Sequence, residues 1–272
     1  MKGRTIVLDH VNGLEAAAYL VDGVLDDLLI DDSDAPRPGA IFRAICDRPI
    51  KGQGGMMLRL PDGETAFLRQ GKGLSPGHAM LVQVTGYAED GKAMPVTDRV
   101  LFKSRYAIVT PGKPGLNISR QIDDEDVRDG LLAVAHGVYD DTFGLILRSS
   151  CAGADEAEIA DDIVAMQDMA HAVMGDAEGR EPEALTDGDG PHGLAWREWT
   201  GAADVVTEEG SFGHLGVLDQ IDHLSDPKVT LGDGTLYVEP TRAMIAVDVN
   251  TGNDTSPGAA LKANLAACRA LP

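Results

Sequence analysis

The sequence predicts an α+β protein built from several subdomains. Alternating apolar segments typical of strands fill roughly the first 120 residues, and an amphipathic helical pattern follows at residues 154–173. The 272 residues allow one large domain or two to three small ones. No apolar stretch approaches about 18 residues, and the first residues do not lead into a secretory signal. We therefore expect a cytoplasmic protein with no membrane partner.

The chain opens with a predicted strand meander in residues 1–36. Thr5–Leu8 and Ala17–Val21 alternate as strands do, and a third strand is expected from 24 to 30. Asp22-Gly23 between the last two is typical of a hairpin turn. The run of Asp, Ser, Pro and Gly at 31–39 excludes regular structure, so we place a subdomain boundary near residue 36.

Residues 37–98 predict a small closed barrel. Five short apolar runs are separated by turns rich in glycine, at residues 40–46, 55–60, 64–68, 79–87 and 93–97. Five such strands in about sixty residues suit a barrel of the OB kind. This barrel frequently binds nucleic acid through a basic face with a few stacking side chains.

Residues 99–174 predict an α/β unit. Strands are expected at 106–109 and 144–148, and Asp123–Asp126 provides the acidic first turn of a helix. The second helix, 154–173, carries its apolar face on Ile159, Ile163, Met166, Ala170 and Val173.

The remainder predicts a loop, three strands and a helix. Residues 175–193 are rich in Gly, Pro, Asp and Glu and indicate a long exposed loop. Strands are expected at 228–231 and 235–239, which end the part 175–240. The part 241–272 holds a strand at 244–249 and a helix at 257–271.

Charge is distributed unevenly along the chain. The formal net charge is −21, yet residues 36–122 carry 13 basic and six acidic side chains between two acidic flanks. The need for solubility explains the acidic flanks, but it does not explain why the net charge becomes positive in residues 36–122. It favours a middle part that faces a polyanion.

The three cysteines, Cys46, Cys151 and Cys268, are isolated thiols with no Cys-x-x-Cys spacing. We expect them to be unreactive and expect no structural zinc site.

Gly86–Lys92 fits the first seven positions of a phosphate-binding loop. Ala93 replaces the hydroxyl residue that such a loop needs for magnesium, and Pro95 prevents the helix that should follow. A hairpin turn in the barrel explains the segment better, although Lys92 could still meet a phosphate from that turn.

Asp248 lies in a hydrophobic strand pattern that places it with Asn250 on one face and Ile245, Val247 and Val249 on the other. A carboxylate at the end of such a strand is placed like a magnesium ligand, with an amide beside it to orient water or phosphate. An Asx turn at the strand end explains the same residues equally well.

Arg148 and Ser149 follow a buried strand. A guanidinium beside a hydroxyl makes a clamp for phosphate or carboxylate, but an arginine that pairs with a nearby acidic helix is the alternative. Trp196 and Trp199 are expected to pack against other side chains rather than to stack on bases.

Four short motifs follow one another along the chain. The first is Leu20-Val21-Asp22-Gly23, and the barrel follows it. The others are Leu116–Ile122 (LNISRQI), Leu147-Arg148-Ser149 and Val247–Gly252 (VDVNTG). In this order, and together with the barrel, they resemble the catalytic half of the ribonuclease E/G family, and the resemblance covers nearly the whole chain.

The resemblance implies a set of subdomains. Residues 1–36 would be RNase H-like strands, 37–98 an S1-type OB barrel, and 99–174 a 5′-sensor subdomain. Residues 175–240 would be an RNase H-like remainder with a long loop, and 241–272 the beginning of a DNase I-like catalytic subdomain.

The resemblance also implies an endoribonuclease that cleaves single-stranded RNA by magnesium-assisted hydrolysis and is stimulated by a 5′-monophosphate. Asp248 would be the catalytic Mg²⁺ ligand, with Asn250 as its positioning partner. Arg148 and Ser149, with the backbone near Ile108, would bind the 5′-phosphate. Phe67, Lys92 and Arg120 would contact RNA. A second barrel aromatic of the family is replaced near Met56-Met57, so stacking should be weaker.

Two family features are missing from the sequence. The second metal aspartate lies on a strand beyond the helix with which this chain stops, and the Cys-Pro-x-Cys zinc link is absent. We therefore expect a truncated piece of a longer enzyme. A noncatalytic RNA-binding or 5′-end-sensing protein is the alternative, and homo-oligomerisation is left open.

Overall fold

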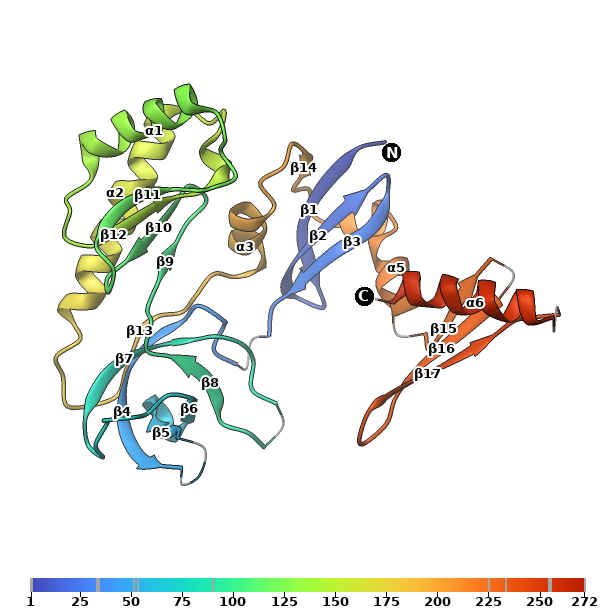
Figure 1. Cartoon of the computed structure of the whole chain (residues 1–272), viewed down its shortest axis with the longest axis horizontal. Helices are drawn as coiled ribbons and strands as arrows, with labels where there is room; N and C mark the ends of the chain where they lie inside the picture. The colour runs from blue at the N-terminus through green and yellow to red at the C-terminus, as the bar shows by residue number, and fades with distance from the viewer. Residues whose placement is uncertain are drawn as a thin grey trace. The chain divides into compact units, whose positions relative to one another are not determined.

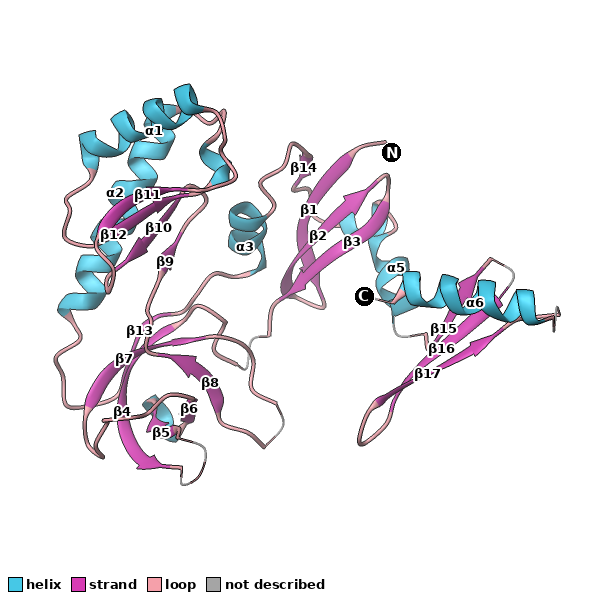
Figure 2. Ribbon diagram, in the orientation of Figure 1, coloured by secondary structure: helices cyan, strands magenta, loops and turns pink. Residues whose placement is uncertain are grey.

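The computed structural model describes residues 2–271 apart from 33–34, 51, 53, 90, 225, 233 and 254–255. The chain divides into two compact units, Met1–Glu209 and Gly210–Pro272 (Figure 1). Strands and helices are both abundant in the first unit and in the second (Figure 2). The predicted α+β class is confirmed.

The N-terminal meander has the predicted strands. β1 (Arg4–Val11), β2 (Leu14–Val21) and β3 (Val24–Ile30) pair antiparallel in sequence order. Both residues of the Asp22-Gly23 turn have positive φ, 52° and 84°, which suits a two-residue hairpin. A fourth strand, β14 (Asp204–Val206), joins β1 in parallel. The helix α3 (Pro191–Glu198) packs on this sheet through Ala195, which contacts Ile6 and Ala17.

The predicted five-stranded barrel is present and closed. Its strands are β4 (Ile41–Pro49), β5 (Met56–Arg59), β6 (Thr65–Leu68), β7 (Ala79–Val84) and β8 (Met94–Thr97). They follow the order β4-β5-β6-β8-β7, and pairing of β7 with β4 closes the ring. β6 and β8 are parallel and the other barrel pairs are antiparallel. This is the topology of an OB fold.

The expected long loop at 175–193 is wrong in part. β13 (Glu183–Thr186) interrupts it and pairs antiparallel with β4. The side chain of Arg43 fixes the preceding segment, donating to the carbonyl oxygens of Asp176 (2.6 Å) and Glu181 (3.0 Å). The segment is ordered because it pairs with a sheet edge and accepts hydrogen bonds from a buried arginine. The composition of residues 175–193 alone indicates neither partner.

The α/β unit has a sheet in the order β11-β12-β10-β9, covered by two helices. The strands are β9 (Phe102–Lys103), β10 (Ala107–Thr110), β11 (Gly115–Ile118) and β12 (Gly144–Leu147). The helices are α1 (Glu125–Val138) and α2 (Glu156–Gly175). Asp124 and Asp155 cap them, each accepting two backbone N–H groups of the first turn.

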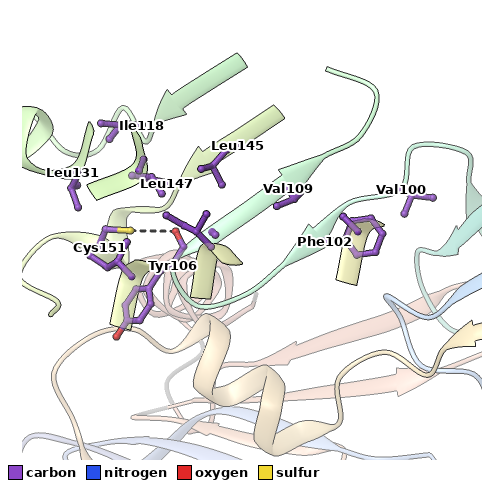
Figure 3. Close-up of a cluster of buried hydrophobic side chains, with 14 of the residues drawn as sticks. Val100, Phe102, Tyr106, Val109, Ile118, Leu131, Leu145, Leu147 and Cys151 are labelled. Carbon is purple, nitrogen blue, oxygen red and sulfur yellow. Dashed lines mark hydrogen bonds between the residues drawn. The ribbon is translucent and has the colours of Figure 1, made fainter. Parts of the chain in front are cut away.

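The core of this unit lies between the sheet and the helices (Figure 3). Leu145, Leu147 and Val109 are almost fully buried in it. Cys151 lies at its edge, where its thiol contacts the carbonyl oxygen of Tyr106 at 3.2 Å. The predicted apolar face of α2 is confirmed at Ile159 and the residues that follow it at helical spacing, Ile163, Ala170 and Val173.

The second unit is a three-stranded sheet with helices. α4 (Ser211–His214) and α5 (Val217–Leu224) precede β15 (Lys228–Leu231), β16 (Gly234–Pro240) and β17 (Ile245–Asn250), and α6 (Pro257–Ala270) follows. The strands pair antiparallel in sequence order, so the sheet spans the expected subdomain boundary at residue 240. Among the described residues of both units, none of the helices is long and apolar enough to cross a membrane.

Candidate functional site

A row of side chains crosses four barrel strands on the outer face. Arg48 pairs with Met57, Met57 with Phe67, and Phe67 with Pro95, in strands β4, β5, β6 and β8. The residues on either side of Met57 and of Phe67 are buried in the barrel, whereas these two side chains are only half-buried. Alternation along each strand therefore places the row on the surface.

Phe67 is held in place by a close approach of backbone. A Cβ atom at Gly55 would lie 2.3 Å from the Cε2 atom of the Phe67 ring and 2.6 Å from its Cζ atom. Gly55 is itself buried, so the ring lies against a strip of main chain that only glycine leaves open. One side of the aromatic ring is thus supported, and the half-buried ring remains partly accessible.

Basic side chains flank this row. Arg59 lies two residues after Met57 on β5, Arg69 lies two residues after Phe67, and both are exposed, as is Arg48. Lys92, in the loop between β7 and β8, pairs with Glu89 at 2.5 Å, and both side chains are largely exposed. Such a pair is worth only about 0 to 1 kcal/mol, so Lys92 is available to a stronger anion.

The segment Gly86–Lys92 does not form a phosphate-binding loop. It is followed by strand β8 and not by a helix, as the sequence predicts from Pro95. Asp90, within that turn, lies outside the described residues.

Arg148 lies on the outer face of the sheet in the α/β unit. Leu145 and Leu147 point into the core, so Ile146 and Arg148 alternate to the opposite face. Ile108 pairs with Ile146 from the central strand β10 and shares that face. Ser149 follows as an exposed residue at the start of a short 3₁₀ turn, Ser149–Cys151.

The Arg148 guanidinium is engaged by three protein groups. Its Nη1 donates to the carbonyl oxygens of Ser104 (2.6 Å) and Arg197 (3.1 Å). Its Nη2 donates to Oε2 of Glu198 at 2.6 Å. The pairing that the sequence offered as the alternative is therefore present, although its partner is the last residue of α3 and not a residue of α1 or α2. The side chain of Arg148 is 17% exposed.

Glu198 is surrounded by cations. Its Oε1 lies 2.8 Å from Nε of Arg197 and 3.7 Å from Nζ of Lys103. Burial raises the pKa of Glu198, but the hydrogen bonds from Arg197 and Arg148 and the nearby positive charges outweigh it and bring this pKa below its usual range. The carboxylate is thus ionised at neutral pH, beside the guanidinium where an external anion would bind.

Arg120 lies at the same end of the sheet as Ser149. It follows β11, which runs parallel to β12, and the backbone N–H of Ser119 donates to the carbonyl oxygen of Leu147 at 2.8 Å. Arg128 holds this turn by donating to the carbonyls of Ser119 and Ile122. Arg120 is exposed. The carboxyl ends of two parallel strands therefore present Arg120 and Ser149 together, as is common for ligand sites.

The two tryptophans differ in their surroundings. Trp199 packs against Tyr19 with ring centroids 5.4 Å apart and donates from Nε1 to Asp27 at 3.1 Å. Trp196 is 60% exposed and contacts the guanidinium of Arg105, whose Cζ lies 4.0 Å from the ring centroid, so it packs on the surface of the fold. Trp196 lies within helix α3, whereas Trp199 is the C-cap residue just past its end, so the two rings have different surroundings.

Asp248 and Asn250 share one face of β17, as predicted. Nδ2 of Asn250 donates to Oδ2 of Asp248 at 2.9 Å. Both are exposed and lie inside the strand, which continues to Asn250, so a turn at Asp248 does not form. Helix α6 covers the other face, because a Cβ at Gly234 would lie 3.6 Å from that of Ala263. Ile245 lies on that covered face but is 67% exposed.

The oxygen donors of Asp248 and Asn250 suit magnesium, which prefers carboxylate and water ligands. A single carboxylate provides few protein ligands for a metal ion. Mg²⁺ nevertheless commonly binds through one or two carboxylates together with the phosphates of a substrate. Within the described part of the chain, no group of three or more His, Cys, Asp or Glu is placed to hold a metal ion. The residues present therefore fit part of a magnesium site.

Comparison with known proteins decides the family. The sequence model of the Ribonuclease E/G family matches residues 102–201 and 196–271, which together exceed half of the chain. This chain belongs to the ribonuclease E/G family. The Ribonuclease E of Nostoc sp. is 27% identical in an alignment 218 positions long that covers 67% of this chain and 32% of that protein. The Ribonuclease G of Escherichia coli K12 is 25% identical in an alignment 211 positions long that covers 65% of this chain and 43% of that protein.

The chain spans less than half the length of these relatives. Within the ribonuclease E/G family match lie Arg148 and Ser149, for which the sequence predicts a phosphate clamp, and the strand of Asp248. The barrel residues Phe67 and Lys92 lie outside it.

Sequence reasoning assigned no functional role to two residues that the fold brings near Arg148, namely Glu198 and Trp196. Glu198 is 50 residues from Arg148, and only the docking of α3 brings them together. Trp196 carries a weak signal in hindsight, because an exposed aromatic beside Arg197 and Glu198 lies outside any apolar stripe.

Proposed function

We propose that this chain binds single-stranded RNA and takes part in its endonucleolytic cleavage in the cytoplasm. The observation that carries the proposal is the row Arg48–Met57–Phe67–Pro95, flanked by Arg59 and Arg69, on the barrel surface. A base stacks on an aromatic side chain with about 1 to 3 kcal/mol, and adjacent cations attract the backbone phosphates. Met57 beside Phe67 supplies an apolar contact and no second aromatic ring, so binding relies on one stack.

The 5′-monophosphate of the RNA is held by Arg148 and Ser149, with Arg120 from the neighbouring turn. A guanidinium offers a fork of donors to a phosphate, and the exposed Ser149 hydroxyl adds another. The phosphate must displace Glu198 from Nη2 of Arg148, and a 5′-hydroxyl has no charge with which to do so. RNA with a 5′-monophosphate therefore binds better than RNA with a 5′-hydroxyl. A contact with the backbone near Ile108 stays a prediction.

Hydrolysis requires an activated water at the scissile phosphate. Magnesium, when bound, supplies a Lewis acid and a more acidic water. Asp248 would hold it, and Asn250 positions the Asp248 carboxylate through their hydrogen bond. Cleavage by water leaves a 5′-phosphate and a 3′-hydroxyl.

A noncatalytic role in RNA binding or 5′-end sensing is the second candidate. The observation in its favour is that Asp248 is joined by Asn250 and by no cluster of further ligands among the described residues. The barrel row and Arg148 serve both functions equally.

A cleavage assay separates the two. The chain is incubated with a single-stranded RNA that carries either a 5′-monophosphate or a 5′-hydroxyl, with Mg²⁺ or with EDTA. Faster Mg²⁺-dependent cleavage of the phosphorylated RNA supports the endoribonuclease. Binding that prefers the phosphorylated RNA, with no cleavage above that of Asp248→Asn, supports the noncatalytic protein. Absence of RNA binding contradicts both.

A further inference from the structure

Trp196 forms an exposed stack with Arg105. The Arg105 Cζ atom lies 4.0 Å from the centroid of the Trp196 ring, and the same guanidinium donates from Nη1 to the Trp196 carbonyl oxygen. With 60% of Trp196 exposed, the guanidinium covers one face of the indole and the opposite face is open to solvent. Cation–π attraction and the backbone bond fix the ring in this position.

The stack adjoins the proposed phosphate clamp. Arg148 donates to the carbonyl of Arg197, the neighbour of Trp196, and to that of Ser104, the neighbour of Arg105. From the other side, the Ser150 hydroxyl donates to the Arg105 carbonyl oxygen at 2.5 Å. The indole and the clamp are therefore joined by hydrogen bonds to rigid backbone.

Holding Arg105 in this position has an energetic cost. Its Nε is buried and has no hydrogen-bond partner among the described residues. A buried donor without a partner destabilises the folded state. Trp199, on the same segment, packs its ring on Tyr19 and donates its Nε1–H to Asp27 within the fold. The arrangement of Arg105 and Trp196 has no such structural explanation if Trp196 only covers the surface.

We propose that Trp196 is the stacking platform for the first base of an RNA whose 5′-phosphate is held by Arg148. The inference rests on the proposed function and deepens it, because it adds recognition of the first base to that of the phosphate. An indole stacks on any base, so Trp196 should recognise that a first base is present and discriminate little between the four bases. Purines, with the larger π surface, bind more tightly than pyrimidines.

The test compares two 5′-monophosphorylated RNAs that differ only in the first nucleotide, which carries adenine or is abasic. Their affinities for the full chain are measured by anisotropy, and the quenching of tryptophan emission is followed in parallel. Trp196→Ala should weaken binding of the adenine RNA about fivefold or more and leave the abasic RNA unchanged. Trp196→Phe should retain most of the preference. Trp196 is exposed, so neither variant should lower the melting temperature.

The outcomes are distinguishable from failure of the proposed function. If the parent chain prefers 5′-monophosphorylated over 5′-hydroxyl RNA but binds the adenine and abasic RNAs equally, the platform is refuted and the phosphate clamp stands. Equal losses for both RNAs in Trp196→Ala also refute the platform. If the parent chain shows no preference for a 5′-monophosphate, the clamp and the platform that depends on it both fail.

Discussion

Replacing Glu198 by Gln removes the carboxylate that pairs with Arg148 in the proposed phosphate clamp. Glutamine keeps the size of the side chain and can still accept a hydrogen bond from Nη2 of Arg148, so the local fold should persist. We expect the affinity for 5′-monophosphorylated RNA to rise. Affinity for 5′-hydroxyl RNA should change little.

The magnitude follows from the exposure and charge of the pair. The Glu198 side chain is 37% exposed, so its pairing with Arg148 is worth about 0 to 1 kcal/mol. A phosphate about 5 Å from the carboxylate would in addition be repelled by about 1 kcal/mol per unit charge in a water-like dielectric. Together these give about 1 to 2 kcal/mol, or about a 5- to 30-fold gain in affinity.

The assay is titration of both RNAs by anisotropy at low and high salt, with Glu183→Gln as the matched control. Glu183 pairs with Arg43 in the same unit but lies on β13. A gain for phosphorylated RNA in Glu198→Gln and none in Glu183→Gln supports competition at the clamp. Unchanged affinity with a lower melting temperature, or an equal gain for both RNAs, would refute it.

Other predictions concern the barrel, the metal strand and the thiols. Phe67→Ala should weaken RNA binding by about 1 to 3 kcal/mol. Gly55→Ala, which displaces the Phe67 ring, should weaken it in the same way. If RNA affinity is unchanged and only the stability of the barrel falls, Phe67 is a core residue and does not bind RNA. Asp248→Asn should lower Mg²⁺-dependent cleavage by orders of magnitude and leave RNA affinity nearly intact; equal turnover removes Asp248 from the site. Burial raises the pKa of Cys151 to about 11, so a thiol reagent at pH 8 should label exposed Cys268 first and Cys151 only after unfolding.

Acid stability offers a further check on Glu198. Because the pKa of Glu198 is lowered in the folded chain, its ion pairs stabilise the fold above the ordinary glutamate pKa of 4.5, and this stabilisation is lost as pH falls below that value. The parent chain should lose more stability than Glu198→Gln between pH 6 and 3, as followed by thermal melts. Parallel curves for the two proteins would contradict the shift.

Elements fixed by neighbouring residues were predictable from the sequence. The Asp22-Gly23 turn, the caps Asp124 and Asp155 and the glycine-separated barrel strands carry their own local signals. The shared face of Asp248 and Asn250 follows from the strand period alone.

Features that depend on distant partners were not predictable in the same way. β13 and β14 are short and have no buried residue, and each becomes a strand only because it meets a sheet edge, at β4 and at β1. Glu198 and Arg148 are 50 residues apart in the chain, and their pairing depends on where α3 packs in the folded protein. Such contacts form in the folded chain and leave no periodicity in the sequence.

The preference of the chain for 5′-monophosphorylated over 5′-hydroxyl RNA, measured in the parent and in Arg148→Ala, tests the central claim most directly. Arg148→Lys keeps the charge but loses the fork, and Arg69→Ala removes an exposed arginine from the barrel edge as the matched control. We predict that Arg148→Ala lowers affinity for the phosphorylated RNA to that of the hydroxyl RNA, that Arg148→Lys restores it in part, and that Arg69→Ala weakens both RNAs equally. If Arg148→Ala weakens both RNAs equally, or lowers the melting temperature while the preference persists, Arg148 is a structural partner of Glu198 and the account is contradicted.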